Sequence, residues 1–377
     1  MPAPVPVLLM VRALDLGGTE RQLSALARSL DRAGFTPHVG CFRAEGVRLA
    51  ELETAGVPIA RFDVHSLRSP SLLAGAAQMR RYIRRNGIRL VHAFDYPAIL
   101  FGIPVARTCP SVVVVSSQRY HRSLRPGWPH RLLRITDHMA DAIVVNCQYL
   151  ARHMIAEEGA PAGLIHLCYN GIDTAEFRPV PDAPRIREVA GASLVIGVAC
   201  ALRPEKNLAT LVDAFARVRP LRAGMKLLLV GDGSCKPVLE AQARRLGISS
   251  DCVFLPGAQA VAPCLGSMDI VVLPSISEAL SNSLMEAMAC GCAVVASNIG
   301  GNVELVSEGR TGLLFDPLDT SRLAAALESL IESESLRRDL SEAGCRFMLQ
   351  QFSLESSARR MEEIYTTLLE RKPRRAP

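Results

Sequence analysis

The sequence predicts an α/β protein of two doubly wound, Rossmann-like parallel-sheet domains that face each other across a cleft. Its 377 residues correspond to two domains, at roughly 150 residues each. Short apolar runs alternate with stretches of helical period, which is typical of βα units. The alternation occurs in two series, and residues 177–184 between them hold three prolines that cannot continue a helix or a central strand. A linker therefore separates two domains of the same type.

The predicted strands are apolar throughout, as expected for parallel strands buried on both faces. In the first series they are Val7–Val11, Pro37–Phe42, Leu90–Phe94, Val112–Ser116, Ala142–Asn146 and Ile165–Cys168. In the second they are Leu194–Ala199, Lys226–Val230, Cys252–Leu255, Ile270–Leu273, Ala293–Ala296 and Gly312–Phe315. Between the strands, apolar residues at helical spacing predict helices that pack one stripe against a sheet, as over Leu208–Val218.

We assign an N-terminal domain to residues 1–176, the linker to 177–184 and a C-terminal domain to 185–355. A last helix and tail occupy 356–377, and its return to the N-terminal domain is left open. Ligands of open α/β sheets bind at the carboxyl ends of the strands. We therefore expect the chemistry in the loops that follow strands.

Composition points to a globular enzyme, because 49% hydrophobic and 21% charged residues exclude a disordered chain, a collagen and a coiled coil. The net charge of +6 comes from the first half, where residues 1–175 hold 20 arginines against 13 acidic residues. Within residues 1–175, the arginines are densest at positions 80–85 and 119–134. Such a surface suits an anionic membrane or lipid headgroup, and a merely solvated surface is the alternative. Nothing in the sequence points to a nucleic-acid partner.

The eleven cysteines are odd in number and form no C-x-x-C pair, which indicates reduced cysteines rather than disulfides or a zinc site. We expect neither a metal nor a cofactor. The first residues lack the features of a signal peptide, and no apolar run approaches the ~20 residues that span a bilayer. We therefore expect a cytoplasmic protein, with any membrane contact peripheral on the inner face of the cell membrane.

The most informative stretch, residues 273–291, indicates a strand, a loop, a helix and a terminal glycine. Asn282 or Ser283 can cap the helix, whose first N–H groups form an anion site that suits a diphosphate. Glu278 in the loop and Glu286 in the first helical turn could accept hydrogen bonds from sugar hydroxyls. The spacing from Ser283 to Glu286 also fits a capping box, in which Glu286 only bonds the cap. Spacing alone leaves both interpretations open.

A second loop, Leu202–Asn207, follows another predicted strand and opens the next helix. Pro204 suits a first helical turn, where Arg203 and Lys206 place two cations. Two cations at the start of a helix favour a negatively charged partner. A phosphate would supply that charge, and a structural ion pair with Glu205 or another acid is the alternative.

Other signals are weaker. Gly17 and Gly18 follow the first strand and let a ligand approach the backbone, although the spacing is not a dinucleotide fingerprint. Asn170-Gly171 predicts a turn with positive φ. His92 and His121 lie near strand ends, where a lone histidine is more often structural than catalytic. The motifs of Ser-His-Asp hydrolases, zinc proteases and P-loop enzymes are missing from the sequence.

Six segments occur in one order: Gly17–Leu23, Asn170–Pro179 (N-G-[VI]-D-x-x-x-F-x-P), Leu202–Asn207 (L-x-P-E-K-x), Val230–Gly233 (V-G-x-G), Glu278–Glu286 (E-x7-E) and Gly300–Glu304 (G-G-x-x-E). Together they resemble the family 4 glycosyltransferases, retaining enzymes of GT-B architecture. One E-x7-E means little in a chain with 37 acidic residues. Six matches in family order are specific and cover nearly the whole chain.

The resemblance implies roles for individual residues. Glu278 would contact the donor sugar, Glu286 the ribose hydroxyls of the nucleotide, and Lys206 the donor diphosphate. Backbone amides would hold phosphate or sugar oxygens, and they belong to Ala279, Leu280, Ser281 and Asn282, with Gly17 and Gly18 across the cleft. The resemblance favours a ligand role for Glu286, which can still cap its helix.

Two positions depart from the family. Ala201 stands where many members carry an arginine, so Arg203 is the candidate for that phosphate contact. The histidine that many members place after the fifth strand of the N-terminal domain has no counterpart. Either Arg119 or His121 takes the acceptor-side role, or that role is absent, and His92 is a third acceptor-side candidate.

The resemblance implies a retaining glycosyltransferase that moves a sugar from a UDP- or GDP-linked donor to a hydroxyl of a lipid-linked, polysaccharide or glycoconjugate acceptor. Lys206, Arg203 and the helix N-terminus would neutralise the departing diphosphate, and Glu278 would position the sugar during front-face transfer. The alternatives are a GT-B sugar-nucleotide epimerase, a sugar phosphorylase and a catalytically silent binding partner. Ala201 and the missing histidine favour the silent partner, whereas the intact Glu278, Lys206 and Glu286 argue against it.

Overall fold

The computed structural model describes residues 3–122, 127–181, 183–257 and 261–372. The chain forms two compact units, Met1–Gly171 with Leu354–Pro377 (unit 1) and Ile172–Ser353 (unit 2). These bounds differ from the predicted domains, because residues 172–176 lie in unit 2 and the chain re-enters unit 1 at Leu354. Residues 373–377 of the predicted tail lie outside the described residues.

Unit 1 contains a seven-stranded parallel sheet of order β3-β2-β1-β4-β5-β6-β7. Its strands are β1 (Val5–Ala13), β2 (Phe35–Arg43), β3 (Ile59–Arg61), β4 (Leu90–Ala93), β5 (Val113–Gln118), β6 (Ala142–Val145) and β7 (Ile165–Leu167). All six predicted strands are present, and the sequence analysis missed only β3. This edge strand has three residues, too few for a periodicity to be recognised.

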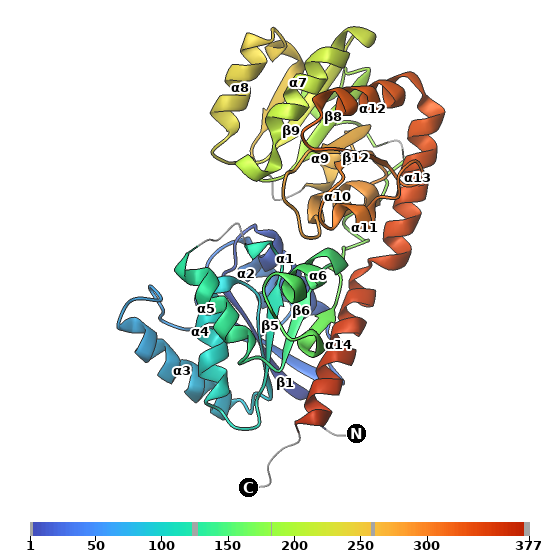
Figure 1. Cartoon of the computed structure of the whole chain (residues 1–377). Coiled ribbons are helices and arrows are strands. Elements are labelled where there is room, and N and C mark those ends of the chain that lie inside the picture. Colours follow the sequence, from blue (N-terminus) through green and yellow to red (C-terminus); the bar gives the residue numbers. More distant parts are fainter. Residues whose placement is uncertain (1–2, 123–126, 182, 258–260, 373–377) are drawn as a thin grey trace. The chain divides into compact units, whose positions relative to one another are not determined.

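Helices cover both faces of this sheet: α1 (Gly18–Ser29), α2 (Val47–Thr54), α3 (Ser71–Arg85), α4 (Tyr96–Arg107), α5 (Trp128–Asp137), α6 (Gln148–Ala156) and α14 (Leu354–Arg371). Alternate residues of β1 enter two separate cores, Leu9 on one face and Leu8 on the other. The last helix, α14, belongs to the core of Leu9 and buries Met361 and Tyr365 there (Figure 1). Unit 1 is therefore completed by a segment that follows unit 2 in the chain.

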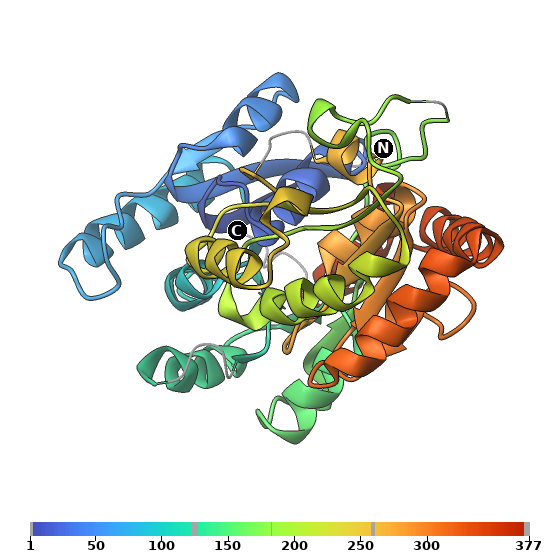
Figure 2. The same ribbon diagram turned by 90° about the horizontal axis from the view of Figure 1, so that it is seen from above.

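Unit 2 contains a six-stranded parallel sheet of order β10-β9-β8-β11-β12-β13. The strands are β8 (Leu194–Ala199), β9 (Met225–Val230), β10 (Cys252–Leu255), β11 (Ile270–Leu273), β12 (Ala293–Ser297) and β13 (Leu313–Phe315). The helices are α7 (Leu208–Val218), α8 (Lys236–Arg245), α9 (Ala262–Leu265), α10 (Asn282–Ala289), α11 (Asn302–Leu305), α12 (Thr320–Glu332) and α13 (Glu334–Gln351). Helices α12 and α13 pack against each other beside the sheet (Figure 2). The predicted pair of doubly wound α/β domains is confirmed.

Each sheet reverses its strand order once, between β1 and β4 in unit 1 and between β8 and β11 in unit 2. At such a switch point the loops after two adjacent strands run in opposite directions and leave a crevice for a ligand. The eleven cysteines are all free and mostly buried, as the sequence analysis expected. In the part of the chain that the structure describes, each helix is too short or too polar to cross a bilayer.

Candidate functional site

Unit 2 brings two of the predicted site residues together at the switch point of its sheet. Lys206 lies in the loop after β8, and Glu278 lies in the loop after β11. The Lys206 ammonium donates a hydrogen bond to Oε1 of Glu278 at 2.5 Å. The Ser275 hydroxyl donates to the same oxygen at 2.7 Å. Ser275 is fully buried and was absent from the predicted site, since serine before a motif carries no signal of its own.

Burial and charge act in opposite directions on this pair. The side chains of Lys206 and Glu278 are 17% and 10% exposed. Burial alone would lower the pKa of Lys206, but the negative charge of Glu278 outweighs it and the pKa is raised. Lys206 is therefore a cation at neutral pH. The sequence left open whether Lys206 faces a phosphate or forms an ion pair with an acid. The structure shows the ion pair, with Glu278 as the acid.

Glycines of two predicted motifs hold these loops in place. A Cβ on Gly231, whose φ is +146°, would lie 1.9 Å from the carbonyl oxygen of Cys200 in the loop of Lys206. A Cβ on Gly300, whose φ is +53°, would lie 2.0 Å from the carbonyl oxygen of Glu278. Only glycine permits such approaches and such dihedrals. The V-G-x-G turn thus contacts the backbone of the loop that carries Lys206, and the G-G-x-x-E loop contacts the backbone of the loop that carries Glu278.

Helix α10 begins differently from the prediction. Its cap is Ser281, whose hydroxyl accepts from the N–H of Leu284 at 3.3 Å, and not Asn282 or Ser283. The capping box is therefore wrong, because the third helical residue is Leu284 and Glu286 lies in the second turn. Glu286 is 6% exposed, and together with burial its charge raises the pKa of Cys290 to about 12.

The rest of this predicted loop is buried. Ala279, Leu280 and Ser281 are at most 7% exposed, and Asn282 is the first residue of α10. Leu284 is the residue whose N–H the Ser281 cap satisfies. The side chains of Ala279, Leu280 and Ser281 are packed inside unit 2 beside the helix N-terminus, where the partial positive charge of the helix favours an anion.

Arg203 is 64% exposed, and its nearest carboxylate oxygen, from Glu205, lies 4.0 Å from its guanidinium. The predicted helix start at Pro204 is wrong, since Pro204–Lys206 form a separate 3₁₀ turn before α7. Asn207 joins the two with a left-handed φ of +50°, and its side chain donates to the carbonyl of Pro317 at 3.0 Å. This break turns Lys206 back toward β11 while Arg203 remains at the surface.

In unit 1, Gly17 and Gly18 lie at the start of α1, at the switch point of that sheet. A Cβ on Gly17 would lie 2.1 Å from a carboxylate oxygen of Glu20, so Glu20 takes the space that the missing side chain leaves. Burial, then Asp95, raises the pKa of Glu20. Asp95 caps α4 by accepting from the N–H of Ala98 at 2.9 Å. The sequence analysis missed both acids.

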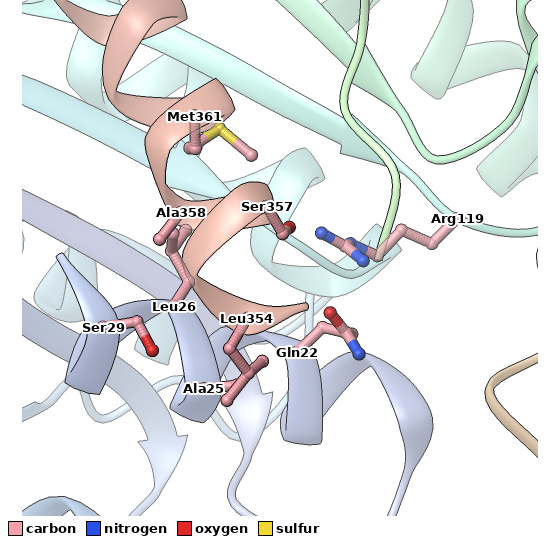
Figure 3. Close-up of a pocket in the computed structure, with 9 residues that line it drawn as sticks. All are labelled: Gln22, Ala25, Leu26, Ser29, Arg119, Leu354, Ser357, Ala358 and Met361. Carbon is pink, nitrogen blue, oxygen red and sulfur yellow. The ribbon is translucent and has the colours of Figure 1, made fainter. Parts of the chain in front are cut away.

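Arg119 has structural partners within unit 1. Its guanidinium donates to Oδ1 of Asn170 at 2.7 Å and lies 4.9 Å from the ring centroid of Phe94. Burial lowers its pKa to about 10, so it remains charged at neutral pH. It borders a cavity of about 10 Å³ between α1 and α14, toward which its guanidinium points (Figure 3). Such a volume holds one water molecule and is too small for a sugar ring.

The Asn170-Gly171 segment makes no turn with positive φ, contrary to the prediction. Instead, the backbone of Gly171 exchanges two hydrogen bonds with the side chain of Gln22, at 2.8 and 3.1 Å. A Cβ on Gly171 would lie 2.9 Å from the Cα of Leu354. Glycine is needed here for the close approach of α14.

His92 is a core residue. It is fully buried on β4, and its ring nitrogens contact the hydroxyls of Tyr365 at 2.6 Å and Ser117 at 2.8 Å. Burial, then the charge of Arg119, holds its pKa well below the usual range. The imidazole has no exposed surface in this structure, which favours a structural role, and the acceptor-side role of His92 stays a prediction. Through Tyr365, His92 pairs with the C-terminal helix.

His121 lies beside helix α6. Its ring is stacked on that of His153, with centroids 3.8 Å apart. Burial, then His153, lowers its pKa, so the imidazole is neutral at neutral pH. The next residue, Arg122, is fully buried and forms a bidentate pair with Asp137 at 2.7 and 2.8 Å. This pair holds the described part of the loop after β5 against α5.

Two family models match the chain, one on each unit. The model described as Glycosyltransferase Family 4 matches residues 16–176. The model described as Glycosyl transferases group 1 matches residues 182–347. Between them they include five of the six segments that carried the resemblance, and residues 170–176 of the remaining one.

The chain is also similar to named proteins. It is 28% identical over 366 residues to a GDP-mannose-dependent alpha-(1-6)-phosphatidylinositol monomannoside mannosyltransferase of Mycolicibacterium smegmatis, covering 88% of this chain and 94% of the relative. It is 29% identical over 293 residues to a D-inositol 3-phosphate glycosyltransferase of Thermobispora bispora, covering 74% and 68%. The crystal structure of Anabaena HepE in complex with UDP-glucose has the same fold, with a TM-score of 0.84 at 24% identity over 96% of this chain and 99% of that one.

Proposed function

The chain belongs to the family 4 glycosyltransferases of GT-B architecture, and we propose that it transfers a sugar from a UDP- or GDP-linked donor to a hydroxyl acceptor with retention of configuration. The observation that carries the proposal is the meeting of Lys206 and Glu278 at the switch point of unit 2. A cation, a carboxylate and the N-terminus of α10 supply there what a nucleotide-linked sugar needs.

The proposed chemistry is electrostatic. As the donor bond breaks, negative charge develops on the diphosphate, and Lys206 and the amides at the start of α10 stabilise it. Lys206 is already charged and positioned, so little reorganisation is needed when the charge develops. Arg203 supports this role from the surface and takes the place of the arginine missing at Ala201. Glu278, held by Lys206 and Ser275, orients the sugar, and Glu286 binds the ribose hydroxyls.

The experiment uses UDP, GDP and a panel of their sugars in a thermal-shift screen. A ligand that binds only the native state raises stability by RT ln(1 + [L]/Kd), so the true donor stands out from the others. The selected donor is then incubated with and without acceptor, and the anomeric configuration of the product is determined by NMR. Sugar conversion without acceptor would indicate an epimerase, binding without turnover a silent partner, and an inverted product would contradict retention.

We further propose a lipid-linked acceptor at an anionic membrane surface. The name of the mycobacterial relative specifies phosphatidylinositol monomannoside, a lipid. In unit 1, the four arginines at positions 80, 81, 84 and 85 of α3 are all exposed, and this helix carries no acidic residue. Helix α5 exposes Trp128, Leu132 and Ile135 among its arginines. Residues 123–126 of the predicted basic stretch lie outside the described residues.

Liposome co-sedimentation tests this surface. Each basic residue near an anionic bilayer contributes about 1 kcal/mol, so changing the four arginines of α3 to Gln should remove most of the binding. The matched control changes four exposed arginines of unit 2, at positions 222, 244, 245 and 338, to Gln. The proposal requires binding to anionic but not neutral vesicles and its loss at high salt. Equal recovery in the supernatant with both vesicle types would point to a soluble acceptor.

A further inference from the structure

A second group of chemically active side chains lies in unit 1. His153 is in α6, Glu157 ends that helix, and His121 comes from the loop after β5. Each offers one donor atom, and the three atoms lie within 4.8 Å of one another. His153 and Glu157 are four residues apart and so share one face of the helix. Two imidazoles and a carboxylate form a typical ligand set for Zn²⁺.

His153 is 5% exposed. Among the described residues, neither of its ring nitrogens makes a hydrogen bond of acceptable geometry. The nearest acceptors are Oε2 of Glu157, 3.2 Å from Nδ1, and Oε1 of Glu158, 3.4 Å from Nε2. Buried polar groups are nearly always bonded, because an unsatisfied one costs about 1–3 kcal/mol. This imidazole therefore points to a partner other than a hydrogen-bond acceptor.

The spacing of the donors fits coordination. A four-coordinate zinc with bonds of about 2.0–2.1 Å places its ligand atoms about 3.3 Å apart. The 3.2 Å between Nδ1 of His153 and Oε2 of Glu157 already has this value. Rotation of the stacked His121 ring would have to bring its nitrogen to the same distance. On the opposite side of His153, Glu158 stands where metal-bound histidines commonly have a carboxylate, which favours the tautomer with the proton on Nε2.

The local charge favours a cation. Two carboxylates, those of Glu157 and Glu158, lie 3.2 and 3.4 Å from the two ring nitrogens of His153. The guanidinium of Arg122 donates two hydrogen bonds to Asp137, and its Nη1 lies 3.6 Å from Oε2 of Glu158. Glu157 is 67% exposed, so an ion can reach the group from solvent.

We propose that His121, His153 and Glu157 bind one divalent transition-metal ion, Zn²⁺ by preference, with water as the fourth ligand. Imidazole and carboxylate select zinc over the hard cations Mg²⁺ and Ca²⁺, which take oxygen ligands. The ion would fasten the loop after β5 to α6. Its ligands all lie in unit 1 and include neither Lys206 nor Glu278, so the role is to order this loop and not to activate the donor.

The test uses full-length, tag-free protein stripped with a chelator. Zn²⁺ is titrated in competition with a chromophoric chelator, and one equivalent is expected to bind. His121→Gln and Glu157→Gln should each weaken binding by at least about tenfold, since each removes a ligand. Neither residue is fully buried, so both variants are expected to fold. The matched control is His138→Gln, an exposed histidine of the same unit, which should bind as the wild type does.

Co²⁺ distinguishes this site from the eleven cysteines. Imidazole and carboxylate ligands give visible d–d bands without the intense ultraviolet charge-transfer band of a thiolate. The visible bands should disappear in His121→Gln. A thiolate band, binding that is unchanged in both variants, or no binding at one equivalent would each overturn the proposal. None of these results bears on donor binding, which is measured separately.

Discussion

Replacing Lys206 by Met tests the ion pair of unit 2. The change leaves the Glu278 carboxylate, 10% exposed, with the hydroxyl of Ser275 as its hydrogen-bond donor. Removing one partner of a buried pair costs about 3–5 kcal/mol, and partial exposure places the expected loss near 3 kcal/mol. For a unit of this size, 1 kcal/mol corresponds to about 2–4 °C. The unfolding transition of unit 2 should therefore fall by about 6–12 °C.

Two further variants separate stability from function. The double variant Lys206→Met/Glu278→Gln leaves no charge without its partner, so most of the stability lost in Lys206→Met should return. The stability regained measures the coupling energy of the pair in a double-mutant cycle. UDP and GDP binding should not return, because the cation for the diphosphate is still missing. Glu278→Gln alone should keep nucleotide binding and lose transfer. Once the donor and acceptor are known, Lys206→Met should lower turnover by about 10²–10³-fold.

The assays are urea unfolding and thermal shift with and without UDP or GDP. Lys236→Met, a partly exposed lysine at the start of α8 in the same unit, is the matched control and should change neither quantity. Wild-type stability in Lys206→Met would refute the energetic reasoning. Wild-type nucleotide binding and turnover in that variant would refute the assignment of Lys206 to the diphosphate.

Three other outcomes are expected. Glu286→Gln should weaken nucleotide binding by about 1.5–3 kcal/mol by calorimetry, whereas Ser281→Ala, which removes the α10 cap, should mainly lower stability by about 0.5–2 kcal/mol in urea. Tyr365→Phe should cost about 1–3 kcal/mol, because it leaves Nδ1 of His92 unsatisfied in the core, and an unchanged urea midpoint would contradict this. Burial, then Asp95, raises the pKa of Glu20, so its ionisation costs stability once the pH rises above about 4.5. Glu20→Gln should therefore melt higher than the wild type at pH 7 and equal to it below pH 4.5, and equal melting at both pH values would disprove that cost.

The fold could be predicted from the sequence because buried parallel strands are apolar throughout. Twelve of the thirteen strands were located in this way, although some of them include a polar residue, such as His92 in β4 and Lys226 in β9. The proline-rich segment after Phe177 lies between the last strand of the first series and the first strand of the second. What failed was local. The sequence allows several caps for α10, and only the course of the loop after β11 selects Ser281. Likewise, the break at Asn207 depends on a left-handed residue that the spacing of Pro204 does not reveal.

Side-chain partners from distant segments could not be predicted. His92 appeared as a residue near a strand end, because its partner Tyr365 comes from the last helix of the chain. The group of His121, His153 and Glu157 has no recognisable spacing, since it joins a loop to a helix that follows a different strand. The expectation of no metal was drawn from the spacing of the cysteines, and that spacing carries no information on a site made of histidines and a glutamate.

The division of unit 1 into two chain segments has a consequence for synthesis on the ribosome. Unit 2 is continuous, so it can fold as soon as residues 172–353 have emerged. Unit 1 has its central strand β1 at the beginning, yet the helix that covers Leu9 and pairs with His92 is made only after all of unit 2. Until then this face of the sheet is covered by α1 and α2 but lacks the side chains of α14, such as Met361 and Tyr365. The N-terminal segment of unit 1 is translated first, yet it must wait longest for its last helix. During that time it is the part of the nascent chain most prone to aggregate or to bind chaperones.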